Sequence, residues 1–300
     1  MKLVHYARNG EVRVGLVDKR RVVDIGELGE HLDVRGSDRV PTIDDILSGG
    51  LLESVRRAAQ TLTFRQAVPL ESLTLRSPIL NPEKILLVAR NYLSHNREQD
   101  AKPPAEPYFF TKFRNSLIGP GETILIPRIS SKADWEAELA VIIGKAGKDI
   151  PRANAMDYVA GYAVANDISF RDLQFSTRSD NAPVTLGNNW VKGKALDSSF
   201  PLGPWLVTQD EIPNPHDLAI SLRVNGRMRQ QSKTSDMIFS IDRLIEYVSA
   251  GMTLKPGDII STGTPQGVAA FTGEQFLKDG DVVEATIDGI GTLRNPVRAE

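Results

Sequence analysis

The amino-acid sequence predicts an α+β fold that is mainly β, with a small β-rich N-terminal domain over residues 1–75 and a larger domain over residues 80–300. Short apolar runs rich in β-branched residues, each closed by turn residues, recur along the chain and predict strands. Two Asn-Gly pairs, at residues 9–10 and 225–226, predict tight hairpins. One segment, Ser240–Val248, has a clear amphipathic helix pattern, so few helices are expected.

The N-terminal domain is predicted from hairpin and helix signals. Residues 2–24 form three short strand patterns, separated by Asn9-Gly10 and by a charged turn at residues 18–21. A helix is expected to begin within Pro41–Asp45, and apolar residues return at helical spacing from Leu51 to Ala59. Residues 68–82 carry three prolines and are expected to form the extended connection to the larger domain.

The larger domain begins with a strand pattern at residues 84–89 and a polar, helix-compatible stretch at residues 90–98. The proline-rich segment Asp100–Pro107 is unsuited to helix or sheet, so we expect a lid or mobile loop there. A second long loop is expected at Phe175–Asn189. Further strands are expected near residues 139–143, 161–167, 205–207, 218–224, 258–262 and 281–287, with a helical turn at 153–158.

The composition is that of an ordinary soluble globular protein, and we expect the protein to be located in the cytoplasm. The net charge of −2, with acidic and basic residues interspersed, indicates no face for nucleic acid or anionic lipid. The chain has no cysteine, which excludes disulfides, thiolate metal sites and a cysteine nucleophile, and fits a reducing compartment. No apolar run is long enough for a signal peptide or a membrane span.

Acidic residues stand at the start of the strand expected at Leu139–Ile143. Because side chains on a strand alternate between faces, Glu136 and Glu138 project from the same side, with Asp134 behind them. Two adjacent carboxylates at a buried strand repel each other and resist desolvation, and a divalent cation removes both penalties. The alternative is a solvated strand end where the acids face water, and these residues alone favour neither interpretation.

Asp167 ends the next strand pattern and provides a third carboxylate. Together with Glu136 and Glu138 it would give three hard oxygen ligands, which suit Mg²⁺ or Mn²⁺ with open positions for substrate or water. With no cysteine and four histidines, a structural zinc site is not expected. Taken alone, Asp167 is more often a turn cap for Ser169 and Phe170.

His95 and Glu98 are three residues apart and share a face if this stretch is helical. A carboxylate beside an imidazole fixes its tautomer and supports its use as a general base. The commoner interpretation of such a pair is a solvated surface turn. Its position between a buried strand and the proline-rich segment favours the catalytic one.

Basic and amide side chains follow the acids. Arg171 is suited to binding a substrate carboxylate, and Lys194 to neutralising the cation site or a developing oxyanion. The amide of Gln174 follows the acids in the same way as these two cations. For both cations, solvation at the surface is the alternative. The glycine-rich loop Thr262–Gly267 lacks the lysine of a phosphate-binding loop and the spacing of a dinucleotide fold, so nucleotide binding is not supported. Its backbone N–H groups are expected to face a ligand.

Several motifs, taken in order, are similar to those of one known family: ARNYLSHNRE, DWEAELAVIIGK, DYVAGYAVANDISFRDLQ, WVKGKALDSSFPLGPW, LRVNGRMRQ, MIFSIDRLIEYVS and LKPGDIISTGTPQGV. From about Lys84 to Val297 the chain resembles the fumarylacetoacetate hydrolase family, and among its members the acylpyruvate hydrolases. The resemblance implies a β-roll that pairs into homodimers and a metal bound by the three acids. It also implies a His95–Glu98 pair on a lid, with the substrate bound by Arg90, Arg171, Gln174, Lys194 and Thr264.

The reaction that the resemblance implies is metal-dependent hydrolysis of a carbon–carbon bond in a 2,4-dioxo acid of the acylpyruvate or fumarylpyruvate type. His95, Glu98 and Lys194 are the expected catalytic residues, and the expected partner is a small 2-oxo acid. Decarboxylation of an oxaloacetate-type acid, isomerisation of a dioxo-enoic acid, dehydration of a sugar acid and hydrolysis of a diketo sugar acid use the same pocket and remain open. A non-catalytic binding protein is disfavoured because all five acidic and His–Glu positions carry competent residues.

Overall fold

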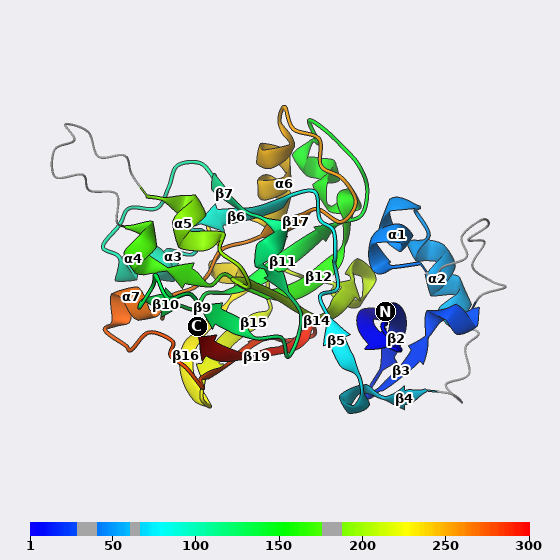
Figure 1. Ribbon diagram of the computed structural model, residues 1–300. Coiled ribbons are helices and arrows are strands. Elements are labelled where there is room, and N and C mark those ends of the chain that lie inside the picture. Colours follow the sequence, from blue (N-terminus) through cyan, green and yellow to red (C-terminus); the bar gives the residue numbers. More distant parts are fainter. Residues whose placement is uncertain (29–40, 61–66, 176–187) are drawn as a thin grey trace.

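The computed structural model describes residues 1–28, 41–60, 67–175 and 188–300. It confirms a mainly β fold with few helices (Figure 1). Most of the loop predicted at residues 175–189 lies outside the described residues. No α-helix in the described ranges is long and apolar enough to cross a membrane.

The described ranges contain nineteen strands, which are distributed over three sheets. They are β1 (Lys2–Arg8), β2 (Glu11–Asp18), β3 (Arg21–Asp24), β4 (Val68–Pro69), β5 (Thr74–Arg76), β6 (Ile85–Ala89), β7 (Tyr108–Lys112), β8 (Leu117–Ile118), β9 (Ile124–Ile126), β10 (Ala133–Asp134), β11 (Ala137–Ile143), β12 (Val159–Asn166), β13 (Ser169–Phe170), β14 (Phe200–Thr208), β15 (Ala219–Val224), β16 (Arg227–Lys233), β17 (Ile259–Ser261), β18 (Val282–Ile287) and β19 (Gly291–Ala299).

The helices are short. The α-helices are α1 (Ile43–Ser48), α2 (Leu52–Ala59), α3 (Leu93–Glu98), α4 (Arg171–Gln174), α5 (Trp190–Lys194), α6 (Ile241–Ser249) and α7 (Ala269–Thr272). Turns of 3-10 helix are η1 (Ile25–Leu28), η3 (Leu70–Ser72), η4 (Arg114–Ser116), η5 (Arg152–Tyr158), η6 (Gln209–Glu211) and η7 (Thr234–Asp236). The predicted helices at 51–59 and 240–248 and the helical turn at 153–158 are therefore confirmed.

The largest sheet has twelve strands and runs in the order β4-β3-β2-β1-β14-β12-β11-β17-β6-β7, with β5 paired to β1 and β8 to β14. A five-stranded sheet has the order β16-β15-β18-β19-β9, and β10 and β13 form a small pair. The N-terminal strands lie to one side of the molecule, where β1 pairs with β14 of the main body (Figure 1).

The predicted hairpins form because their turn residues adopt left-handed backbone conformations. Asn9 and Gly10 have φ angles of 52° and 82° and join β1 to β2. Asn225 and Gly226, with φ angles of 51° and 76°, join β15 to β16 in the same way. Two successive positive φ angles are the requirement of a type I′ turn, which Asn-Gly meets at low cost.

Strand β11 is buried on both faces, which explains its continuous apolar sequence. Leu139, Val141 and Ile143 belong to the core shared with the five-stranded sheet and α6. Ala140 and Ile142 belong to a second core, shared with N-terminal residues such as Leu3 and Ile43. By strand alternation, Glu136 and Glu138 lie on the face of the second core, at its end.

Candidate active site

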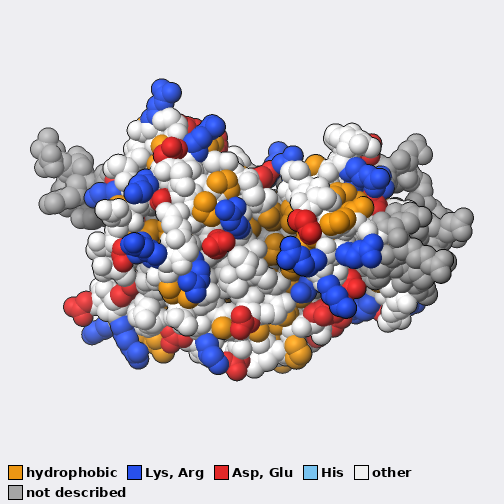
Figure 2. Space-filling model, turned by 90° about the horizontal axis from the view of Figure 1, so that it is seen from below, with side chains coloured by type: hydrophobic (Ala, Val, Ile, Leu, Met, Phe, Trp, Pro, Cys, Tyr) orange, Lys and Arg blue, Asp and Glu red, His pale blue; other side chains and the backbone are white. Residues whose placement is uncertain are grey.

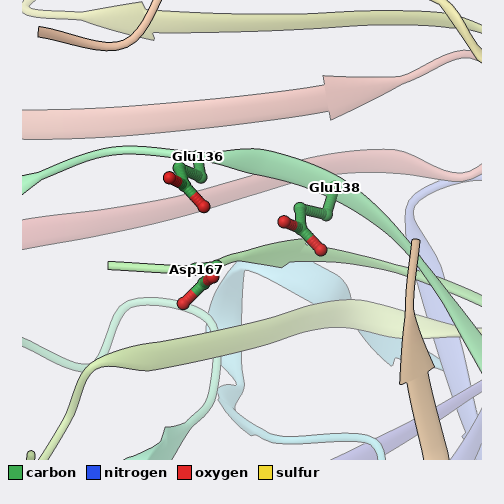
Figure 3. A group of neighbouring side chains, drawn as sticks. All are labelled: Glu136, Glu138 and Asp167. Atoms are coloured by element: carbon green, nitrogen blue, oxygen red, sulfur yellow. The ribbon is translucent and has the colours of Figure 1, made fainter. Parts of the chain in front are cut away.

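Strand register places three carboxylates together. Ala137 of β11 pairs with Asn166 of β12, so Glu136 and Glu138 lie beside Asp167, which directly follows β12. Their ligand oxygens all lie within 4.8 Å of one another, and each side chain is at most 8% exposed. Figure 3 shows the three side chains as neighbours, with those of Glu136 and Glu138 both directed toward the side on which Asp167 lies. The solvated strand end is therefore excluded.

Glu136 is held by two cations. It accepts a hydrogen bond from Arg171 Nη2 at 2.5 Å and one from Lys194 Nζ at 2.8 Å. Burial alone would raise the pKa of this carboxyl, but Lys194 and Arg171 hold it well below its usual range. Glu136 is therefore ionised and fixed in place.

Glu138 accepts hydrogen bonds from neutral groups, Ser261 Oγ at 2.5 Å and the backbone N–H of Gly263 at 3.0 Å. Burial, with the neighbouring carboxylates of Asp167 and Glu136, raises the pKa of Glu138 well above its usual range. Among the residues that the structure describes, no cationic side chain forms an ion pair with Glu138. Its ionised form therefore needs a cation from elsewhere.

Asp167 has one oxygen without a hydrogen bond. Its Oδ2 accepts from Lys194 Nζ at 2.6 Å. Lys112 Nζ lies 3.0 Å from Oδ1 but donates to the backbone carbonyls of Ile168, Lys194 and Ser199, so Oδ1 accepts no hydrogen bond from any described residue. Burial lowers the pKa of Lys112 to about 8, and burial raises that of Asp167.

These observations fit a divalent cation. Asp167 Oδ1 is fully buried, accepts no hydrogen bond and has only the Lys112 ammonium beside it at 3.0 Å, and Glu138 has no cationic ion-pair partner among the described residues. Both arrangements are costly, and a further positive charge between the two carboxylates would lower that cost. All three donors are carboxylates, the ligand type that Mg²⁺ and Mn²⁺ prefer. Glu136, Glu138 and Asp167 therefore form a site competent for a divalent metal ion.

The His95–Glu98 pair belongs to the same region. Both residues lie on α3, and His95 Nδ1 is 2.5 Å from Glu98 Oε1. The other oxygen of Glu98 accepts the backbone N–H of Gly267 at 2.9 Å, which fixes the carboxylate. Because Nδ1–H donates to Glu98, Nε2 is the basic nitrogen of His95. Nε2 accepts a hydrogen bond from the side-chain amide nitrogen of Gln99 at 2.7 Å. His95 is only 6% exposed, so the pair is not a solvated surface turn.

One cavity of about 400 Å³ connects these groups. Its polar lining includes all but two of the predicted site residues. Another part of its wall is aromatic: Phe110 stacks on Trp190, with 4.6 Å between the ring centroids. The predicted residues that line it are Arg90, His95, Glu136, Glu138, Arg171, Gln174, Lys194 and Thr264. Glu98 and Asp167 contact this lining from behind, through His95 and Lys194.

Comparison with known proteins supports the same family as the motifs. Residues 84–298 match the family model described as fumarylacetoacetate (FAA) hydrolase C-terminal. The chain belongs to the fumarylacetoacetate hydrolase family.

Relatives and solved structures within this family differ in their stated activities. A mitochondrial oxaloacetate tautomerase of Xenopus laevis is 47% identical over 227 residues, covering 75% of this chain and 69% of that protein. The fumarylacetoacetate hydrolase of Exiguobacterium antarcticum has a TM-score of 0.81 at 32% identity, with all of both chains covered. Maleylpyruvate hydrolase of Sphingobium sp. SYK-6, solved with manganese and pyruvate, has a TM-score of 0.76 at 29% identity, covering 100% of this chain and 99% of that one.

The structure shows which groups three of the predicted site residues contact: Arg171, Gln174 and Thr264. Arg171 donates through Nε to Asp134 at 2.9 Å, as well as to Glu136 and to Gln174 Oε1, so all three of its nitrogens are engaged within the protein. Its predicted binding of a substrate carboxylate remains a prediction. The Gln174 amide nitrogen has no partner among the described residues and is available to the cavity. Thr264 Oγ1 donates to Ala137 O at 2.9 Å.

Sequence reasoning missed several residues of the site. Lys112 donates hydrogen bonds to three backbone carbonyls around the site. Because a lysine at a strand end is normally solvated, the sequence around Lys112 did not indicate a buried role. Ser261 is similarly inconspicuous. The aromatic wall of Tyr108, Phe110 and Trp190 comes from segments far apart in the sequence. No local sequence pattern predicts that side chains from such distant segments will meet.

Proposed function

We propose that this protein is a divalent-metal-dependent enzyme that interconverts the keto and enol forms of an oxaloacetate-type 2-oxo acid. The observation that carries the proposal is a buried three-carboxylate cluster in one cavity with the His95 base and the Lys194 ammonium. The Xenopus laevis relative, which is 47% identical, is named as an oxaloacetate tautomerase, and this supports the choice of reaction.

The cation, Mg²⁺ or Mn²⁺, would be held by Glu136, Glu138 and Asp167. When bound, it supplies Lewis-acid polarisation of the substrate's 2-oxo group. Ser261 and the Gly263 N–H keep the Glu138 carboxylate oriented toward this position. The chain's own contribution is therefore a preformed oxygen donor set.

His95 moves the proton. In the keto-to-enol direction its Nε2 removes a proton from the carbon next to the 2-oxo group, and Glu98 stabilises the imidazolium that forms. The enolate oxygen is then protonated and His95 deprotonated by exchange with solvent, which gives the enol and restores the base. In the reverse direction solvent removes the enol proton and the imidazolium returns a proton to that carbon. Gln99, which contacts Nε2 at 2.7 Å, must yield this position to the substrate. No atom is gained or lost in the exchange.

Lys194 stabilises the negative charge at the enolate oxygen. Its ammonium has three donors, and two of them are engaged by Glu136 and Asp167. The third is available to the cavity that Lys194 lines. The Gln174 amide nitrogen offers a second donor to the same substrate, which orients it.

Hydrolysis of a carbon–carbon bond in an acylpyruvate, the reaction expected from the sequence, is the second candidate. The resemblance to maleylpyruvate hydrolase over the whole chain supports it. His95 would then take a proton from water, and the same groups would stabilise the pyruvate enolate that leaves. Decarboxylation, isomerisation and sugar-acid reactions share this enolate chemistry but gain no specific support from the described contacts.

The test follows the ultraviolet absorbance of enol-oxaloacetate and of an acylpyruvate, with chelator-stripped protein, with and without Mg²⁺ or Mn²⁺. Metal alone is the control for uncatalysed exchange. Tautomerase activity appears as metal-dependent loss of enol absorbance without pyruvate, whereas pyruvate from the acylpyruvate indicates hydrolysis. Protein that accelerates neither reaction beyond metal alone contradicts both candidates.

A homodimer is also proposed. Strand β7 is the last strand of the large sheet, and beside it Phe113 is 48% exposed. An apolar side chain at an open sheet edge favours pairing with a second copy of the chain. Light scattering after size exclusion should give twice the chain mass; a monomer at micromolar concentration contradicts this. The cytoplasmic location stays a prediction, since the Xenopus relative is named as mitochondrial.

A further inference from the structure

Arg90 differs from the other basic side chains of the cavity because it has no acidic partner in the part of the chain that the structure describes. Arg171 is paired with Asp134 and Glu136, and Lys194 with Glu136 and Asp167. Arg90 lines the same cavity, is exposed, and forms no ion pair or side-chain hydrogen bond with any residue that the structure describes. Its guanidinium is therefore available to a ligand in the cavity.

The backbone of Arg90 is held in an unfavourable conformation. Its φ angle is +54°, in the left-handed region that non-glycine residues seldom adopt because Cβ crowds the following carbonyl oxygen. Asn96 Nδ2 donates to the Arg90 carbonyl at 2.8 Å and fixes it. Next to it, the buried Asn91 side chain donates to the carbonyls of Phe239 and Thr262. Strain of this kind persists where the surrounding structure fixes it, and it concentrates at ligand sites.

The cavity is larger than the part of a substrate that the acids and His95 require. A volume of about 400 Å³ lies within the range of roughly 300–1,000 Å³ typical of drug-sized ligand sites. A 2-oxo acid head group near the carboxylate cluster leaves room for a further substituent. Among the residues that the structure describes, the lining offers that substituent one cation without an ion-pair partner, Arg90, and an aromatic wall of Phe110 and Trp190.

We propose that Arg90 binds the second carboxylate of a dicarboxylic 2-oxo acid and is the residue that selects dicarboxylates over monocarboxylates. This inference rests on the proposed function, whose substrate class it specifies. A guanidinium binds a carboxylate through two parallel hydrogen bonds, and here no acid of the described ranges forms an ion pair with it. The aromatic wall packs against the flat carbon chain between the two ends of such a substrate.

The test is calorimetric binding to Mn²⁺-loaded protein of two unreactive ligands, pyruvate and 2-oxoglutarate, which share the head group and differ in the second carboxylate. We expect 2-oxoglutarate to bind more tightly. Arg90→Gln should weaken 2-oxoglutarate roughly ten- to a hundredfold, the usual effect of losing a hydrogen bond to a charged group, and leave pyruvate unchanged. Arg90→Lys should restore part of the difference, because it keeps the charge but not the bidentate geometry.

Arg97→Gln is the matched control, since Arg97 is an exposed arginine of α3 outside the cavity lining. It should change the affinity for neither ligand. Equal weakening of both ligands by Arg90→Gln, or no weakening of 2-oxoglutarate, overturns the inference. The binding readout needs no turnover, so a protein that lacks tautomerase activity but keeps the Arg90-dependent preference would contradict the proposed reaction and not this assignment.

Kinetics give an independent readout in active protein. Arg90→Gln should raise KM for oxaloacetate with little change in kcat, because the second carboxylate is bound equally in the ground and transition states. A fall in kcat with unchanged KM would assign Arg90 to the chemistry and overturn its role in selection. Unchanged KM and kcat would show that the second carboxylate binds elsewhere in the cavity.

Discussion

Glu138 carries the charge that the protein itself compensates least. Glu138→Gln keeps the hydrogen-bonding shape but removes one of three anionic metal ligands and the repulsion from Glu136 and Asp167. We expect Mn²⁺ affinity to fall by about 100-fold or more, since losing even a supporting hydrogen bond to a ligand costs 10–100-fold. The metal-free variant should nevertheless unfold at a higher temperature than metal-free wild type.

Calorimetric metal titration and thermal unfolding of chelator-stripped protein check this pair of effects. Glu53→Gln, on α2 and 60% exposed, is the control and should change neither. A stabilised variant with full metal affinity would remove Glu138 from the ligand set. A destabilised metal-free variant would mean that its negative charge is compensated within the protein.

His95 is the residue that should separate chemistry from binding. His95→Ala removes the base whose Nδ1 is held by Glu98 at 2.5 Å, while the three carboxylates keep their own partners. We expect kcat to fall by about 10²–10⁴, the usual contribution of a general base, with Mn²⁺ affinity within a few-fold of wild type.

Stopped-flow enol absorbance and metal titration measure the two quantities. Glu98→Gln, which keeps the contact to the Gly267 N–H but loses the charge, should give an intermediate rate. A near wild-type rate for His95→Ala would remove His95 from the proton transfer.

At the residue level, the acids and the His–Glu pair were predictable because their chemistry appears as short spacings. Glu136 and Glu138 share a strand face, and His95 and Glu98 a helix face. The third proposed ligand, Asp167, depends on the register between β11 and β12, which local sequence does not encode. The local sequence around Asp167 favoured a turn cap over a metal ligand. Only the family motifs indicated that Asp167 belongs to a metal site.

The helices α4 and α5 act as one element that brings Arg171 and Lys194 to Glu136. They approach so closely at Gly193 that an added Cβ would lie 2.4 Å from Gln174 Cβ and 2.7 Å from its Cα. Gly193→Ala should therefore push α5 away from α4 and cost about 1–3 kcal/mol of unfolding free energy, as overpacking does. The same shift should weaken Mn²⁺ binding, because Lys194 and Arg171 no longer hold Glu136 together.

Chemical unfolding and metal titration test this separation of helices. Lys192→Ala, at an exposed position of α5, is the matched control and should change neither quantity. Loss of stability with unchanged metal affinity would mean that the helices separate without moving the two cations.

Among the elements, those set by local chemistry were predicted well. Asn-Gly turns and the apolar face of α6 are short-range signals, and the structure places both as expected. The loop Thr262–Gly267 was expected to direct backbone N–H groups at a ligand. Instead Gly263 and Gly267 direct theirs at Glu138 and Glu98, so the loop orients site residues. Which acid a backbone N–H faces is decided by packing between distant segments.

At the scale of the whole molecule, the N-terminal segment is tied to the main body by hydrogen bonds. β1 pairs with β14, and residues 68–82, expected to be an extended connection, include β4 and β5, which pair with β3 and β1. The prolines of this connection limited the strand signal. The family was predictable because motifs are spread over most of the main body. The reaction was not, because one constellation serves tautomerisation and hydrolysis alike.

His5 links the N-terminal elements through a buried neutral imidazole. It is fully buried, its Nδ1–H donates to the Ser77 carbonyl at 2.9 Å, and its Nε2 accepts the Ile43 N–H of α1 at 2.8 Å. Burial lowers the pKa of His5 below its usual 6.5, although the Ser77 hydrogen bond, Asp44 and Asp45 oppose the shift. Protonation would add a hydrogen to Nε2 and break the contact that anchors α1.

The folded pKa of His5 lies below the unfolded one, so the unfolded chain binds the extra proton first. Its contribution to stability is therefore complete above pH 6.5 and declines as the pH falls through 6.5 toward the folded pKa. His5→Gln, which does not titrate, should lose less Tm than wild type between pH 7.5 and pH 5.5, with roughly 2–4 °C for each kcal/mol of difference. Scanning calorimetry of both proteins at the two pH values measures this, and parallel decreases would show that other groups carry the acid sensitivity. Because His5 connects α1 to the Ser77 segment before β6, acid should loosen the N-terminal elements while leaving the carboxylates of the proposed metal site in place.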